Sequence, residues 1–167
     1  MRPKIQKQTK KHFFIKSYAH LWQLEDAIKV ALKEGSERLS LSVLGKLAEH
    51  CISGDRKILD SKKQLKAYWR GSLGPNTDFG LFCNPEIGTL FIAGNLVSQF
   101  LHDLDGKALG TMSSGPYGIL RGLGLPKDDA ARYIKLLNEE HFLLMARGYC
   151  YQLDRLGEEL EKLQKME

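Results

Sequence analysis

The chain has 167 residues, of which 43% are hydrophobic and 27% are charged, and these proportions are ordinary for a soluble globular protein. This length suggests one domain with a sizeable core. The net charge of +5 permits contact with anionic partners but does not demand it, because 20 acidic residues are mixed among the 25 basic ones. Residues 1–11 contain four lysines and one arginine but no acidic residue. We interpret them as a basic flexible arm that could make a weak electrostatic contact with an anionic partner.

Cysteine usage and hydropathy narrow the class of protein further. Cys51, Cys83 and Cys150 are odd in number and form no CxxC pair, which argues against a disulfide framework or a thiolate zinc site. This usage fits a reducing cytosol. The most apolar stretch, residues 87–101, is interrupted by polar residues and is shorter than the ~20 residues of a spanning helix. No signal pattern precedes it, so we expect a cytoplasmic, soluble protein without a transmembrane segment.

The first third of the chain predicts a strand, a helix and a second strand. Residues 12–17 (HFFIKS) carry apolar side chains on both faces, as a buried strand does. Residues 21–32 place apolar side chains at three- and four-residue steps, which predicts an amphipathic helix that ends near Gly35. Residues 39–44 then alternate apolar and polar side chains.

Residues 45–84 give weaker signals and are interpreted as an insertion within a single domain spanning residues 12–150. A helical turn is expected at 48–52 and a helix at 60–69. The following text, GSLGPNTDFG, breaks regular structure with its glycines and proline.

The second half of the chain predicts two more strands and several helices. Residues 89–93 (TLFIA) are the third strand, and residues 142–146 (FLLMA) are the fourth. Between them we expect a helix capped by Asn95 and ended by Gly106, a short helix after Pro116, and a longer helix after Pro126. Residues 151–167 predict a C-terminal amphipathic helix.

This order of elements predicts an α+β fold, namely a ferredoxin-like split β-α-β sandwich with a four-stranded antiparallel sheet, a helical and loop insertion, and a C-terminal helix. We expect both principal helices, which begin near Leu21 and Pro126, to cover one face of that sheet.

Two stretches, PEIGTLFIAGNL and GLGLPKDDAARYIKLLNEEHFLLMARG, resemble the bacterial general stress protein (heat-induced stress protein) family. The matching residues are Pro85, Gly88, Gly94, Gly122, Gly124, Pro126, Ala130 and Tyr133, together with the strand at 142–146. HFFIKSYAHLWQLEDAIKVALKEGSERLSLSVLGK is similar to the family's opening strand, helix and strand. Glu86, Asn95 and Glu140-His141 depart from the pattern. The resemblance implies a fold, and it implies no catalytic residue, because these motifs describe packing.

One turn could bind an anion. Ser113, Ser114 and Gly115 precede a helix start and could present backbone N–H groups, with Arg121 nearby. The spacing lacks the GxxxxGK[ST] pattern of a nucleotide-binding loop, so tight packing of a turn is the alternative interpretation.

The histidines and cysteines form no recognisable catalytic or metal-ligating motif. His12, His20, His50, His102 and His141 lack HxxxH or HExxH spacing. His50 beside Cys51 could ligate a metal, and His102 with Asp103 and Asp105 could form an acid–base pair, but a hydrophilic helix end explains the latter equally well. The three cysteines are expected to be buried small hydrophobes. We therefore predict no catalytic residue, no metal site and no cofactor.

The last helix carries a stripe of leucines at steps of three, four and three: Leu153, Leu156, Leu160 and Leu163. This spacing suits either a short coiled-coil seam between subunits or packing against the domain. The leading hypothesis is a non-enzymatic stress-type protein that acts through protein association, as a homo-oligomer or with a protein partner. The alternatives are a small-ligand or anion-binding regulatory module and an enzyme with an unrecognised site. Specific nucleic-acid binding is not expected, because TLFIA lacks the aromatic and basic residues of an RNA-recognition strand.

Overall fold

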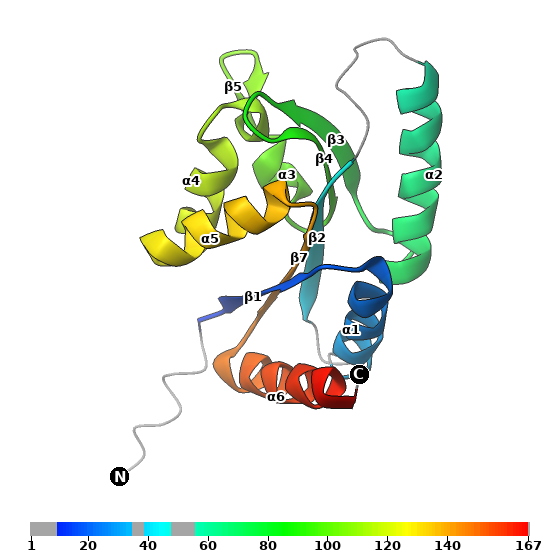
Figure 1. Ribbon diagram of the computed structural model, residues 1–167, viewed down its shortest axis with the longest axis vertical. Helices are drawn as coiled ribbons and strands as arrows, with labels where there is room; N and C mark the ends of the chain where they lie inside the picture. Colours follow the sequence, from blue (N-terminus) through cyan, green and yellow to red (C-terminus); the bar gives the residue numbers. More distant parts are fainter. Residues whose placement is uncertain (1–9, 35–38, 48–55, 167) are drawn as a thin grey trace.

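The computed structural model describes residues 10–34, 39–47 and 56–166, and within these ranges five strands form one antiparallel sheet in the order β1-β7-β2-β4-β3 (Figure 1). The strands are β1 (His12–Tyr18), β2 (Ser40–Lys46), β3 (Phe79–Asn84), β4 (Gly88–Gly94) and β7 (Phe142–Gly148). β7 pairs with β1 on one side and with β2 on the other, in antiparallel fashion. The first and last strands of the chain therefore lie side by side.

Helices cover both faces of this sheet, because side chains of successive strand residues point to opposite faces and most strands are apolar on both. Leu143 and Met145 belong to one hydrophobic cluster, whereas Leu144 and Ala146 belong to the other. α1 (Leu21–Glu34), α2 (Arg56–Leu73) and α6 (Cys150–Met166) contribute to the second cluster. α3 (Val97–Phe100), α4 (Gly115–Gly122) and α5 (Lys127–Asn138) contribute to the first. The fold is therefore α+β with three layers.

The connection between α3 and α4 is short and irregular. It contains a small hairpin of β5 (Asp103–Leu104) and β6 (Lys107–Ala108), followed by a 3-10 turn, η2 (Leu109–Thr111). Positive φ angles at Asp105 (52°) and Gly106 (87°) turn this hairpin. The predicted helix from Asn95 to Gly106 is wrong beyond α3, because α3 ends with its C-cap at Leu101 and the chain then forms the β5–β6 hairpin.

The strands predicted at 12–17, 39–44, 89–93 and 142–146 are confirmed within one or two residues, but among the described residues the main sheet has five strands rather than four. The additional strand, β3, lies inside the predicted insertion and pairs with β4 along its whole length. The helix predicted at 60–69 is confirmed and extends over Arg56–Leu73. The helical turn predicted at 48–52 lies outside the described residues.

The predicted position of the two principal helices is wrong. α1 and α5 pack on opposite faces, because Leu24 and Ala27 contact one cluster and Ala130 and Leu137 the other. A two-layer ferredoxin-like sandwich is therefore not confirmed.

Candidate ligand-binding site

The structure does not assemble the anion-binding turn predicted at Ser113, Ser114, Gly115 and Arg121. Both serines are exposed before the first turn of α4, whereas Arg121 lies in its last turn and its Nη1 donates to the Leu125 carbonyl at 3.3 Å. At 1.5 Å per residue, roughly 10 Å of helix separates Arg121 from Ser114. The pocket beside the serines also contains Glu86, whose negative charge disfavours an anion.

The leucines of the predicted association surface are buried within the chain rather than exposed. Leu153, Leu156 and Leu160 are 7%, 0% and 1% exposed, and Leu163 is partly buried against the same cluster. This side of α6 faces the sheet, and the leucines pack in the same hydrophobic cluster as residues of α1 and the strands. Packing against the domain is therefore the correct alternative for these leucines.

His12 lines the pocket that holds the α6 carboxylates Asp154, Glu158 and Glu161, whereas His20 and His102 lie elsewhere. His20 stacks on Trp22 with ring centroids 6.2 Å apart, and His102 is exposed beside Asp103 and Asp105 in the small hairpin region. His50 lies outside the described residues. Across the part of the chain that the structure describes, no three His, Cys, Asp or Glu residues are grouped to hold a metal ion.

The cysteines differ from the prediction of buried free thiols. Cys150 is free and exposed, and Cys83 is exposed and disulfide-bonded. Cys51 lies outside the described residues. The disulfide weakens the inference of a reducing compartment that rested on the cysteine pattern.

A polar pocket of about 320 Å³ lies where the starts of β2 and α3 approach the end of β7. Its described lining is Phe13, Ser40, Ser42, Asn95, Leu96, Gln99, Met145 and Arg147. The corner between β4 and α3 builds one wall. Gly94 adopts a φ of +107°, and a side chain there would collide with the Leu41 carbonyl, so the chain crosses close over β2. The Leu96 amide then donates to Ser42 Oγ at 3.0 Å.

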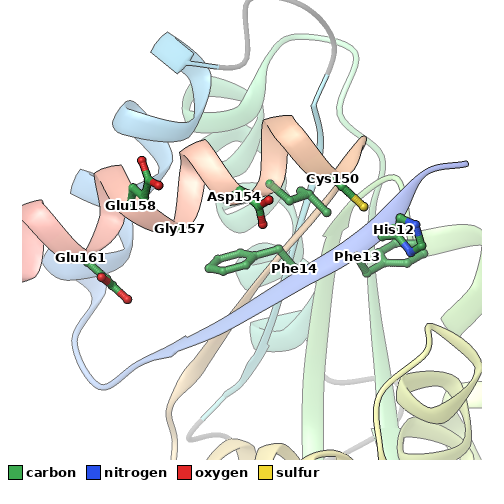
Figure 2. Close-up of a pocket in the computed structure, with 9 residues that line it drawn as sticks. His12, Phe13, Phe14, Cys150, Asp154, Gly157, Glu158 and Glu161 are labelled. Carbon is green, nitrogen blue, oxygen red and sulfur yellow. The ribbon is translucent and has the colours of Figure 1, made fainter. Parts of the chain in front are cut away.

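Arg147 supplies the charge of this pocket. Its guanidinium lies over the Phe13 ring, 5.9 Å from the centroid, and no ion pair joins it to a carboxylate among the described residues. Hydroxyl and amide groups of Ser40, Asn95 and Gln99 share the lining with it, and no acid does. Two other pockets carry acids, namely Glu86 in one and three α6 carboxylates in the other (Figure 2). Of these three, only the Arg147 pocket suits an anion.

An apolar groove of about 560 Å³ adjoins the polar pocket and shares Phe13 and Gln99 with it. The rest of its described lining is Leu109, Met112, Ser114, Gly115, Gly118, Ile119, Gly122 and Leu123. The groove is open because α4 presents glycines to it: a Cβ at Gly118 or at Gly122 would meet nothing within 4 Å. Asn84 holds the segment that brings Leu109 and Met112 to the groove, because its Nδ2 donates to the carbonyls of Gly110 (3.0 Å) and Met112 (2.9 Å).

Sequence reasoning missed this site because its polar residues come from separate segments. Ser40, Asn95 and Arg147 are far apart in the chain, and only the pairing of β7 with β2 brings Arg147 opposite Ser40. The one feature of the sequence that could have indicated this site is Arg147, a charged residue directly after the apolar run FLLMA.

Comparison of the chain with protein-family models, curated proteins and solved structures finds no match. The resemblance to the general stress protein family therefore stays a prediction from the sequence. No helix in the described ranges is both long enough and apolar enough to cross a bilayer.

Proposed function

We propose that the protein is a non-enzymatic binding module for a small amphipathic anion, a molecule with a carboxylate or phosphate head and an apolar tail. The observation that carries the proposal is the Arg147 guanidinium, which has no carboxylate partner among the described residues and lines a polar pocket that shares Phe13 and Gln99 with an apolar groove. This proposal keeps the alternative expected from the sequence, a small-ligand or anion-binding module, but transfers it from Arg121 to Arg147.

The two parts of the site favour different parts of the ligand. A guanidinium presents several N–H donors in a plane, which matches the oxygens of a carboxylate or a phosphate. The amides of Asn95 and Gln99 and the hydroxyl of Ser40 provide further donors at the same pocket. The groove lined by Leu109, Ile119 and Leu123 contributes through burial of the tail, at about 0.8 kcal/mol for each methylene removed from water.

Thermal unfolding with octanoate, octyl phosphate and the neutral octanol tests this assignment. We expect both anions to raise the melting temperature, because a ligand at 100 times its dissociation constant adds about 2.7 kcal/mol of stability. Octanol is expected to bind more weakly, since it lacks the charge that pairs with Arg147. The Arg147→Ala variant should bind octanoate about 10- to 100-fold more weakly, the loss expected for one charged hydrogen-bonding partner.

Two arginine variants serve as controls. Arg132→Ala removes the same charge from an exposed α5 residue that pairs with Asp129, far in the sequence from the pocket. Arg121→Ala tests the site predicted from the sequence alone. Both should keep the affinity of the unaltered chain. Equal losses in Arg147→Ala and Arg132→Ala, or no response of the unaltered chain to either anion, would contradict the proposal.

A further inference from the structure

β1 is an edge strand that is long and rich in aromatic residues. Within the described ranges it pairs with β7 alone, so no strand lies along its outer side. It spans seven residues, HFFIKSY, without proline. An edge strand presents unpaired N–H and C=O groups, which can pair with the strand of another chain. The Tyr133 hydroxyl donates to the Ile15 carbonyl at 2.8 Å. That oxygen keeps a second lone pair.

An acidic pocket of about 560 Å³ lies between β1 and α6. Figure 2 shows Phe14 extending from β1 beneath α6, with Asp154, Glu158 and Glu161 along the helix. All three carboxylates are exposed, and no cation among the described residues forms an ion pair with them. The described lining of this pocket contains no lysine or arginine. A partner with a positive charge at this position would therefore complement it.

Lys16 of β1 can supply this positive charge from a second copy of the chain. His12 lies beside Cys150 in the pocket lining, Phe14 lies beside Gly157, and Lys16 Nζ donates to Gln164 Oε1 at 3.1 Å. β1 thus follows α6 from its first turn to its last. A second β1 in antiparallel pairing centred on Ile15 would place its own Lys16 opposite Phe14. Residues directly opposite each other point to the same face of a sheet, so this Lys16 would meet the α6 carboxylates.

We propose that two copies of the chain associate through β1, joining their sheets into one continuous antiparallel sheet, with Lys16 of each copy in the acidic pocket of the other. Because the dimer is two-fold symmetric, the contact between Lys16 and the acidic pocket forms twice, once in each direction. This surface lies at β1 and α6, and the proposal does not depend on a ligand at Arg147.

The molar mass of the full chain, measured by sedimentation equilibrium over a range of protein concentrations, tests the proposal. We expect a monomer–dimer equilibrium that shifts toward the monomer at high salt, since exposed charge pairs are screened. Lys16→Glu should shift it further toward the monomer, because a carboxylate then faces three carboxylates. Adding Glu158→Lys to Lys16→Glu should recover part of the dimer, because the new carboxylate then faces one lysine and two carboxylates rather than three carboxylates.

Lys135→Glu is the matched control, because it makes the same charge change in the last turn of α5. It should keep the mass of the unaltered chain, and circular dichroism should show that each variant is folded. Lys16→Glu should still respond to octanoate, which separates this test from the ligand proposal. A monomer at every concentration of the unaltered chain, or equal masses for Lys16→Glu and Lys135→Glu, would overturn the proposed interface.

Discussion

Asn84 holds the loop before α4 onto the sheet through its side chain. It is 3% exposed, and its Oδ1 accepts from the amides of Glu86 (2.9 Å) and Ile87 (3.1 Å). Its Nδ2 donates to two carbonyls of the 110–112 segment, as described above. The side-chain amide is therefore satisfied on both its donor and acceptor sides. One residue fixes both the β3–β4 hairpin and a wall of the apolar groove.

Replacing Asn84 with alanine is expected to destabilise the protein by about 3 kcal/mol, because two amides and two carbonyls lose a buried partner. Urea unfolding measures this difference. Asn84→Asp should be similarly harmful, since a carboxylate cannot donate to the carbonyls of Gly110 and Met112. Asn138→Ala is the control, because Asn138 is exposed and its Oδ1 accepts a hydrogen bond from the exposed Lys46 Nζ at 3.1 Å. A change of less than about 1 kcal/mol for Asn84→Ala would contradict this role.

At the scale of elements, α4 is a helix of low intrinsic propensity. Its sequence is GPYGILRG, and glycine costs about 1 kcal/mol relative to alanine inside a helix. Ile119 and Leu120 are 5% and 0% exposed, so burial of these side chains stabilises α4 despite its glycines. The exposed glycines Gly118 and Gly122 leave room for the groove.

Gly118→Ala is therefore expected to raise stability by about 0.5–1 kcal/mol, because it reduces the entropy of the unfolded chain without a clash. Gly71→Ala in α2 is the matched control, since a Cβ there also meets nothing within 4 Å. Both variants should show a similar gain in thermal unfolding. A loss of stability in Gly118→Ala alone would show that α4 packs more closely than described.

Filling the groove should separate stability from binding. Gly118→Leu places a large apolar side chain where the ligand tail is proposed to lie, while Gly71→Leu places one on the exposed side of α2. We expect octanoate affinity to fall at least about tenfold in Gly118→Leu, the loss for 1.4 kcal/mol, and to stay unchanged in Gly71→Leu. Isothermal titration calorimetry measures both, and equal affinities would exclude the groove as the site of the tail.

At the scale of the whole molecule, the sheet needs helices on both faces. On the α6 side, Trp69 stacks on Phe91 with centroids 5.3 Å apart, and Phe91 in turn lies 6.4 Å from Phe142. A side chain at Gly45 would collide with the Phe91 ring, so the glycine makes room for this aromatic stack. α6 completes the same cluster with its leucines, which explains why they do not form an exposed seam.

Leu156→Ala is expected to destabilise the protein by about 2–5 kcal/mol, because Leu156 is fully buried and its truncation leaves a cavity. Its molar mass at equilibrium should match that of the unaltered chain. Chemical denaturation and sedimentation together test both expectations. A lower mass with unchanged stability would instead favour the leucine seam predicted from the sequence.

The sequence by itself determined four of the five strands of the main sheet and most of the described helices, because the periodicity of apolar residues depends on local backbone geometry. It missed β3, since FGLFCN follows a run of glycines and a proline that obscures its start. It also placed α1 and α5 on one face, although strands such as β7 are apolar on both faces and admit helices on either side.

Only the tertiary structure decided which residues share a site. Arg147, Ser40 and Asn95 meet because β7 lies beside β2 and the Gly94 corner crosses over it, and no local pattern encodes such long-range pairing. The same holds for the α6 leucines, whose spacing suits a core stripe or a subunit seam equally. Whether a stripe is buried within one chain depends on what packs against it, which is a property of the folded molecule.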